Sequence, residues 1–366
     1  MATVKRRGTG WQAAYRGPDG RERTRTFPRQ VDAQRWVTEQ TAALNKGDWI
    51  DPRAGRVTFG DFAEVWRQAQ VHRPTTRASV ESHLRTNLLP AFGERPINTV
   101  RPSEVQALVR RLSDRLAPAT VTVAFRYLSM IFLAAVTDGL IARNPCTGTK
   151  LPQKMPVRVV PLEVADVQHI IEALPPRLRA VGLVGAGAGL RHGEALGLTV
   201  DRVDFLRRQI VVDRQLITLE RQQPQLAPPK TASSVRTVPV PDLVLKALAR
   251  HLEEFEPGEW GLLFTLPDGR AMPRNMFHLA WRAAVNKSGA RPGAIFHDLR
   301  HFYASALIHH GESVRVVQER LGHASAKMTL DVYSHLWPAS EDKTRRAIEA
   351  AFEGLADLPR TLELGN

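Results

Sequence analysis

The clearest periodic pattern of apolar residues lies between positions 57 and 145. Apolar side chains recur there three and four residues apart, which places them on one face of an α-helix. The series is Val121, Ala124, Phe125, Leu128, Ile131, Phe132 and Ala135. An earlier helix begins after Thr58, which with Asp61 resembles a capping box, and reaches about Val71. We predict about four helices in this region, which end at Arg143-Asn144-Pro145, and assign the apolar series to their core.

The first 55 residues show a different, extended pattern. Two short runs within residues 9–27 flank the turn sequence Gly17-Pro18-Asp19-Gly20, which predicts a β-hairpin. Three basic residues alternate along its second strand and therefore share a face: Arg21, Arg23 and Arg25. Such a row can line a DNA groove or form a solvated surface, and the pattern leaves both open. A helix follows from about Val31 to Leu44, and Gly47–Arg56 has the composition of a linker.

The remainder of the chain mixes helices with a small sheet. A proline-containing linker at residues 146–161 precedes it, and strand-like runs occupy Gln209–Asp213 and Val235–Pro239. From Ile295 to about Leu355 the pattern is helical again. The glycines of GAGAGL, residues 185–190, do not have the spacing of a dinucleotide-binding loop. We predict a mainly α fold with small β-sheets, in domains of residues 1–55, 56–150 and 151–366.

Charge narrows the class of partner. The chain carries 51 Lys and Arg against 37 Asp and Glu, a net charge of +14. The first 150 residues hold 24 of these basic and 13 of these acidic residues, so +11 of the +14 lies there. An excess of this size attracts polyanions, of which nucleic acid is the commonest. We therefore predict that the front of the chain holds phosphates and that the nearly balanced back performs chemistry.

Several other classes of protein are excluded. Cys146 is the only cysteine, so disulfide frameworks and cysteine-rich zinc sites are ruled out. The first residues, MATVKRRGTGW, lack the apolar stretch of a signal peptide. The longest apolar run, Ala180–Leu190, is too short and too rich in glycine to cross a bilayer. We expect a cytoplasmic protein without a membrane partner.

The sequence HDLRH, residues 297–301, is the first candidate for chemistry. His297 and His301 have the spacing of a helical zinc site, but Asp298 follows the first histidine and Arg300 would place a cation against the metal. We therefore expect no metal ion here. On a helix His297 and Arg300 lie three residues apart and share a face, which suits them to bind an oxyanion.

Four further segments complete an ordered set across some 140 residues. The set consists of Arg191 in GLRHGEALGL, Lys230 in PKTASSVRTVPV, His297 and Arg300 in HDLRH, His323 in LGH and Tyr333 in DVYSHL. This set strongly resembles the tyrosine recombinase (phage integrase) family over about residues 160–350. The region from Thr58 to about Pro145 looks like the helical core-binding domain of that family. The hairpin and helix before it look like its arm-type DNA-binding domain.

The resemblance implies a site-specific recombinase that cuts and rejoins DNA through a 3′-phosphotyrosine, without metal or cofactor. Tyr333 would be the nucleophile, while Arg191 and Arg300 would hold the phosphate oxygens, as guanidinium suits. His297 would act as the acid or base and Lys230 as the general acid for the leaving 5′-oxygen. His323 would donate a hydrogen bond to a non-bridging oxygen. His301 would have a supporting or structural role, and Asp298 would orient a neighbour.

The resemblance also implies partners. These are double-stranded DNA with core and arm-type attachment sites, a homotetramer in the synaptic complex, and a directionality factor. The expected activity is integration and excision of a mobile element such as a prophage. Three alternatives use the same residues: a chromosome or plasmid dimer resolvase, a type IB topoisomerase, and a non-catalytic DNA-binding regulator. The N-terminal extension disfavours the first, the extension and C-terminal helix disfavour the second, and the full set of catalytic residue types disfavours the third.

Overall fold

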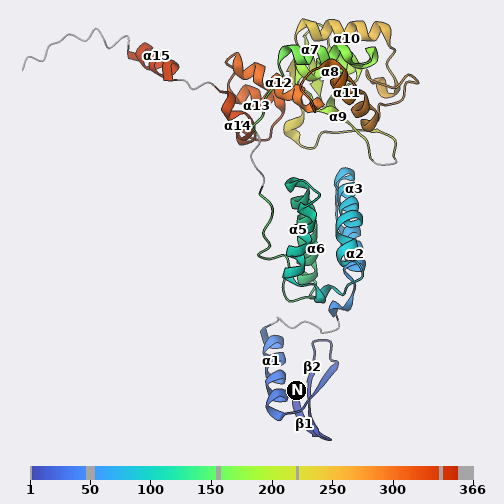
Figure 1. The fold of residues 1–366 in the computed structure, drawn as a ribbon, viewed down its shortest axis with the longest axis vertical. Helices are drawn as coiled ribbons and strands as arrows, with labels where there is room; N and C mark the ends of the chain where they lie inside the picture. Colours follow the sequence, from blue (N-terminus) through green and yellow to red (C-terminus); the bar gives the residue numbers. More distant parts are fainter. Residues whose placement is uncertain (1, 47–53, 154–157, 220–221, 338–340, 353–366) are drawn as a thin grey trace, which may run out of the picture. The chain divides into compact units, whose positions relative to one another are not determined.

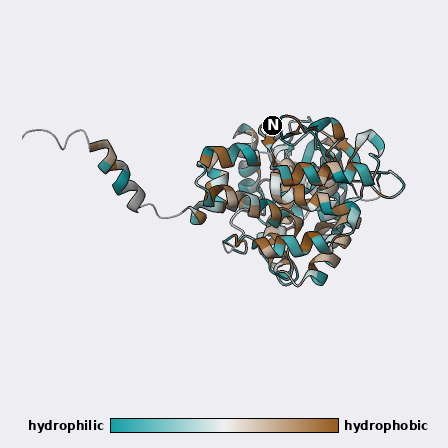
Figure 2. Ribbon diagram, turned by 90° about the horizontal axis from the view of Figure 1, so that it is seen from above, coloured by the Kyte–Doolittle hydropathy of each residue, from teal (hydrophilic) through white to brown (hydrophobic). Residues whose placement is uncertain are grey.

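The fold comes from a computed structural model that describes residues 2–46, 54–153, 158–219, 222–337 and 341–352 (Figure 1). The chain divides into two compact units, Met1–Pro156 and Val157–Asn366. This division lies inside the proline-containing segment 146–161. The parts of the two expected linkers at residues 47–53 and 154–157 lie outside the described residues. Along the helices, hydrophobic and hydrophilic residues are interspersed, as in elements that bury one face (Figure 2).

A three-stranded antiparallel sheet and one helix begin the first unit. The strands are β1 (Thr3–Arg7), β2 (Gly10–Arg16) and β3 (Glu22–Phe27), in the order β1-β2-β3, and the helix is α1 (Gln30–Lys46). The predicted hairpin and helix are confirmed. Strand β1 was not predicted, because TVKRR contains a single apolar residue and so shows no alternation. Side chains of the sheet and α1 form a small core of Ala13, Ala33 and Val37, with Trp11, Phe27 and Trp36 against it.

The second part of this unit is helical. It contains α2 (Phe59–Ala69), α3 (Pro74–His83), a π-helical turn (Leu84–Leu88), α4 (Leu89–Phe92), α5 (Pro102–Ser113) and α6 (Pro118–Thr137). The hydroxyl of Thr58 caps α2 by accepting a hydrogen bond from the Asp61 amide at 3.1 Å. The predicted apolar series on α6 is buried, except that Phe125 is partly buried. Helix α6 is long and apolar enough to cross a membrane, but these side chains instead fill the helical core.

In the described residues of the second unit, two small sheets are combined with eight α-helices that precede the C-terminal helix. One sheet has the strand order β4 (Val203–Asp204), β5 (Gln209–Val212), β8 (Arg236–Pro239), and the other pairs β6 (Gln215–Ile217) with β7 (Gln225–Ala227). The helices are α7 (Val164–Ala173), α8 (Pro176–Ala188), α9 (His192–Leu196), α10 (Asp242–Glu254), α11 (Arg274–Ser288), α12 (Phe296–His309), α13 (Val314–Leu321) and α14 (Ala326–Tyr333). The last helix is α15 (Glu341–Phe352), and residues 353–355 of its predicted range lie outside the described residues.

Helices α8 and α12 pack closely, and the glycines of residues 185–190 allow this approach. A Cβ on Gly185 would lie 2.8 Å from the ring of Phe296 and 2.9 Å from Leu299. Gly189 ends α8 in the left-handed conformation with a φ of 61°, and a Cβ there would lie 2.4 Å from the ring of Tyr303. These glycines therefore set the position of α12, which carries the HDLRH sequence.

Candidate active site

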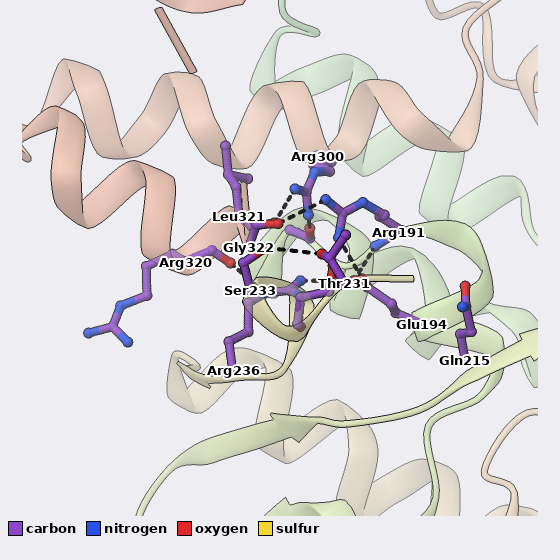
Figure 3. A network of polar contacts seen from close by, with 12 residues as sticks. Arg191, Glu194, Gln215, Thr231, Ser233, Arg236, Arg300, Arg320, Leu321 and Gly322 are labelled. Carbon is purple, nitrogen blue, oxygen red and sulfur yellow. Dashed lines mark hydrogen bonds and ion pairs between the residues drawn. The ribbon is translucent and has the colours of Figure 1, made fainter. Parts of the chain in front are cut away.

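Backbone carbonyls hold the two predicted arginines in place. Arg300 on α12 is 1% exposed and donates from Nη1 to the Gly189 carbonyl at 2.7 Å and from Nη2 to the Leu321 carbonyl. Arg191, the N-cap residue of α9, donates from Nη2 to the Gly322 carbonyl at 3.2 Å. Figure 3 shows both guanidiniums gathered around the end of α13. Burial first, and then repulsion by Arg191 and Arg236, lowers the pKa of Arg300 to about 9, so its charge is retained near neutral pH.

A third arginine joins this cluster through a buried carboxylate. Glu194 is 4% exposed and accepts from Nη1 of Arg191 at 2.7 Å and from Nη2 of Arg236 at 2.8 Å. Burial alone would raise the pKa of Glu194, but the hydrogen bond and charge of Arg236, with the charge of Arg191, lower it to about 2. One carboxylate therefore faces three guanidiniums. The positive excess suits a phosphodiester, whose single negative charge needs compensation.

Two histidines belong to the same electrostatic environment. Burial, then the charges of Arg300, Arg191 and Arg236, lowers the pKa of His323 to about 3, and its Nδ1 lies 2.9 Å from Oγ1 of Thr329. The pKa of His297 falls to about 4, through desolvation by the surrounding protein atoms and then through repulsion by His301, Arg300 and Arg191. The side chain of His297 nevertheless remains accessible to solvent at the start of α12. Both rings are neutral near pH 7, and a bound anion would raise both pKa values.

Tyr333 is the last residue of α14, and its side chain is 1% exposed. Its hydroxyl oxygen lies 2.7 Å from Nδ1 of His301. Burial raises the pKa of Tyr333 to about 12, while the charges of Arg300 and Arg191 act in the opposite direction. Removal of this proton at pH 7 costs about 7 kcal/mol at 1.36 kcal/mol per pKa unit. The phenol therefore needs a nearby base before it can act as a nucleophile.

Lys230, like His297, is a predicted catalytic residue whose side chain makes no hydrogen bond or ion pair among the described contacts. Lys230 follows β7 in the sequence and is exposed. The turn that follows it is nonetheless linked to the cluster. Oγ1 of Thr231 lies 3.0 Å from Oγ of Ser234, and the Ser234 carbonyl accepts from Nη1 of Arg236 at 3.1 Å. The structure thus brings together Arg191, His297, Arg300, His323 and Tyr333, and leaves Lys230 on the adjoining turn.

Sequence reasoning missed the parts played by two residues, Arg236 and His301. Arg236 lies in the quoted segment PKTASSVRTVPV, where the pattern of Val235–Pro239 predicts a strand and no role in the site. Its signal was available, because Arg236 has the same phase in β8 as the buried Val238. His301 was given a supporting role, although it lies one helical turn after His297 and on the same side of α12. Among the described residues, no group of three or more His, Cys, Asp or Glu side chains could hold a metal ion.

The three N-terminal arginines lie in the first unit, apart from this cluster in the chain. Arg21 precedes β3 and is exposed, with its Nε 4.0 Å from Asp19. Arg23 donates to both carboxylate oxygens of Asp19, at 2.8 and 3.0 Å. The guanidinium of Arg25 lies over the ring of Phe27, 5.1 Å from its centroid.

The strand register shows which face of the sheet carries Arg23 and Arg25. Tyr15 pairs with Arg23 and Ala13 pairs with Arg25, and paired residues share a face. Ala13 and Tyr15 are buried on the side where α1 packs, so the two arginines lie at the edge of that side. The opposite face, which we call the open face, carries Lys5, Gln12 and Thr26 in one row, flanked by Thr3, Arg7, Ala14 and Thr24.

Family models match most of the chain. The phage integrase family model matches residues 161–339, the phage integrase central-domain model matches residues 59–151, and the phage integrase N-terminal-domain model matches residues 4–46. A putative prophage phiRv2 integrase of Mycobacterium tuberculosis is 28% identical over 341 residues, which cover 89% of this chain and 88% of that protein. A tyrosine recombinase XerC-like protein of Caldanaerobacter subterraneus is 28% identical over 329 residues, which cover 81% and 84%.

Solved structures share the fold. The integrase of transposon Tn1549, in complex with a circular intermediate DNA, matches with a TM-score of 0.68 and 23% identity over 80% of this chain and 99% of that one. A lambda integrase, solved as a tetramer bound to a Holliday junction, matches with a TM-score of 0.58 and 17% identity over 91% and 93%. At these identities the likeness establishes the architecture, in which a sheet-containing N-terminal region, a helical region and a mixed catalytic region follow one another.

Proposed function

The chain belongs to the phage integrase family of tyrosine recombinases, and we propose that its arginine–histidine cluster performs the strand exchange of that family with Tyr333 as the nucleophile. The chain is a site-specific recombinase of the tyrosine type that integrates mobile elements. The single observation that carries the assignment of residues is convergence. Arg191, Arg300 and Tyr333 come from three separate helices, yet the charges of both arginines act on the phenol.

The cluster accounts for cleavage in physical terms. When the oxygen of Tyr333 attacks the phosphorus, negative charge accumulates on the two non-bridging oxygens. Arg191 and Arg300 are held by carbonyls in advance, so little reorganisation is needed when that charge appears. Preorganised donors of this kind are worth about 3 to 4 kcal/mol each. His323, with Nδ1 on Thr329, has Nε2 left to donate to the same oxygens.

The leaving group completes the step. The bond from phosphorus to the 5′-oxygen breaks, and Lys230 on its exposed turn supplies the proton that this oxygen needs. The product is a 3′-phosphotyrosine, in which an ester to Tyr333 replaces the broken ester to the 5′-oxygen. Attack by water would instead have left a broken strand with no such ester. A 5′-hydroxyl from a second duplex can attack this ester, and the strands are thereby exchanged. The ester bonds of the substrate and the product have nearly equal free energies. Direction must therefore come from DNA architecture and from a directionality factor.

Binding of DNA is divided among the three segments. Residues 151–366 carry the chemistry, the helical segment 56–150 holds the core site together with them, and residues 1–55 bind arm-type sites. The positive charge of the first 150 residues supports this division, since phosphate contacts supply most of the affinity. Within the first segment, Arg21, Arg23 and Arg25 can contact phosphates from the edge of the sheet. The open face is the better candidate for contacts within a groove, because its side chains are polar or small and α1 covers the other side.

The active complex is a homotetramer on two duplexes, in the cytoplasm, where an element can enter and leave its host DNA. Helix α15 supports this assembly, because Ile348 and Phe352 each remain 54% exposed and are available to a second subunit. A dimer resolvase would share the chemistry, and a type IB topoisomerase would act on one duplex as a monomer. Relaxation of supercoiled DNA that lacks attachment sites would identify the second of these activities.

A nicked suicide substrate tests the assignment of the nucleophile. A nick beside the cleavage position lets the short leaving strand diffuse away, so the phosphotyrosine cannot be reversed. The wild-type chain should become covalently joined to a duplex that carries the core attachment site, while Tyr333→Phe should bind the same duplex without becoming joined. Gel mobility under denaturing conditions separates the two outcomes. Equal trapping of both proteins would overturn the assignment of Tyr333.

A further inference from the structure

The contact between Tyr333 and His301 extends the proposed function, on which the following inference rests. The two residues are 32 positions apart, and their rings meet edge to face with centroids 5.6 Å apart. The phenol oxygen and Nδ1 are 2.7 Å apart, which is the distance of a strong hydrogen bond. We propose that His301 accepts the proton of the Tyr333 hydroxyl during cleavage and returns it to the same oxygen during rejoining.

The geometry of α12 separates His301 from the histidine that the family resemblance points to. His297 lies one turn earlier, with its ring perpendicular to that of His301 and 4.9 Å away between centroids. The charges of Arg191 and Arg300 act on His297, and His297 acts in turn on His323, so it belongs to the phosphate-binding group. His301 instead contacts the nucleophile. One helix therefore presents one histidine to the phosphate and another to the phenol.

The protonation states before reaction favour transfer in this direction. The raised pKa of Tyr333 keeps the proton on the phenol, which therefore donates the hydrogen bond. Burial lowers the pKa of His301; Asp298 opposes this shift, and Arg300 and Arg291 add to it. A neutral ring accepts at Nδ1 when its own proton is on Nε2. The charged or titratable groups around this ring are thus Asp298, Arg300, Arg291, His297 and Tyr333.

The proton balance of the step is complete. The bond from the Tyr333 oxygen to phosphorus forms, the phenol proton moves to Nδ1 of His301, and the bond from phosphorus to the 5′-oxygen breaks. The leaving oxygen takes its proton from Lys230. His301 therefore holds the proton of the phenol while Lys230 supplies the proton of the 5′-hydroxyl. The carboxylate of Asp298 favours the imidazolium that results. Rejoining reverses each transfer, and no oxidant, reductant or metal enters the step.

Burial places a condition on this pair. Tyr333 and Arg300 are each 1% exposed, so both side chains have to become more accessible before DNA can contact them. The hydrogen bond between Tyr333 and His301 is already formed in the absence of DNA. DNA binding therefore has to make this pair accessible but does not have to bring the two residues together. The same contact would also allow an opposite role, in which His301 restrains the tyrosine. The two roles predict opposite effects when the imidazole is removed.

The test compares His301→Ala with His309→Ala in the full chain, since His309 is exposed on the same helix. Covalent joining to a nicked core-site duplex is timed for each. We expect His301→Ala to slow joining about 100-fold at pH 7, the lower range for loss of a general base, and His309→Ala to leave it unchanged. Added imidazole should raise the rate of joining by His301→Ala about tenfold or more. A merely structural defect would not respond to imidazole in this way. His301→Ala at the wild-type rate, or faster, would overturn the proposal.

A second pair of measurements identifies the oxygen on which His301 acts. Sulfur in place of the bridging 5′-oxygen gives a leaving group that needs no proton. It should therefore restore the rate of joining by Lys230→Ala, while joining by His301→Ala should remain slow. His301→Asn keeps an acceptor near the position of Nδ1 but cannot take a proton, and it should stay slow as well. Recovery of the rate by sulfur in His301→Ala, or by the asparagine, would refute proton acceptance. Failure of the wild-type chain to join DNA would instead refute the proposed function.

Discussion

At the scale of single residues, the proposed site depends on the buried carboxylate of Glu194, which lies three residues after Arg191 in the sequence. Glu194 bridges Arg191 and Arg236 from a position that solvent scarcely reaches. Removal of one partner from a buried ion pair leaves an uncompensated charge, which is strongly destabilising. The bridge therefore fixes two guanidiniums at once and contributes both to stability and to the geometry of the arginine cluster.

Glu194 makes stability depend on pH in a definite direction. Its folded-state pKa of about 2 lies below the ordinary value of 4.5, so its contribution is complete above about pH 4.5 and is lost as the pH falls toward 2. This contribution is on the order of 3 kcal/mol. The free-energy difference between the wild-type chain and Glu194→Gln should therefore shrink when urea unfolding is measured at pH 5, 4 and 3. Asp331→Asn, which removes an exposed ion pair with Lys327, serves as control, and a difference that does not vary with pH would contradict the expectation.

The order of motifs in the sequence supplied the candidate residues of the site, but their contacts could not be predicted from it. Motif order named six candidates, and five of them converge in the structure. The bond between Glu194 and Arg236 joins residues 42 positions apart, and the bond between His301 and Tyr333 joins residues 32 apart. Helical spacing predicts contacts only between residues three and four apart. It cannot predict contacts between segments that are far apart in the sequence.

At the scale of elements, α12 carries three of the residues that surround the proposed site. It carries His297, Arg300 and His301 within little more than one turn, and its position against α8 depends on small residues. Gly189 has two functions there. Its left-handed backbone ends α8, and its carbonyl accepts from Arg300. The end of one helix and the key side chain of another are thus coupled through a single residue.

Substitution of Gly189 should separate the effect of its close packing against α12 from the effect of backbone strain. Gly189→Ala imposes a left-handed conformation on alanine, which costs roughly 1 to 2 kcal/mol, and also places a Cβ 2.4 Å from Tyr303. Gly289→Ala, at the end of α11, has a φ of 70° and no atom within 4 Å of the added carbon, so it reports strain alone. We expect Gly189→Ala to lower the free energy of unfolding more than its control and to reduce covalent joining. Equal effects of the two substitutions on both measurements would show that the contact with Tyr303 is unimportant.

The elements themselves were predicted unevenly, for reasons that lie in their patterns. Helix α6 has a long apolar series and was predicted with its core face, and the turn at residues 17–20 gave the hairpin. Strand β1 was missed because only Val4 is apolar in it. The strands Gln209–Asp213 and Val235–Pro239 each proved one residue shorter, since a pattern does not define where pairing stops.

At the scale of the whole molecule, the distribution of charge and the matches to family models agree. The central and N-terminal models cover the region in which +11 of the net +14 lies. The sequence therefore predicts which part holds DNA, and the resemblance adds the expected division of that part into core and arm functions. Charge alone does not identify the contacting face of an element, because phosphates attract any exposed cation. The register of the N-terminal sheet adds this information.

Neighbouring arginines on β1 offer a matched test of which face meets DNA. Arg7 lies on the open face, where its Nη1 donates to Gln12 at 3.1 Å, while Arg6 pairs with Trp11 on the side of α1. Each phosphate contact contributes about 0.9 to the slope of log affinity against log salt concentration. Arg7→Ala should therefore reduce that slope by about one for arm-site DNA, whereas Arg6→Ala should leave it nearly unchanged. Core-site DNA should be insensitive to both, if residues 1–55 serve the arm sites. A larger loss with Arg6→Ala would place the DNA against the helix side, where Arg23 and Arg25 lie, and would restore the face that alternation alone suggested.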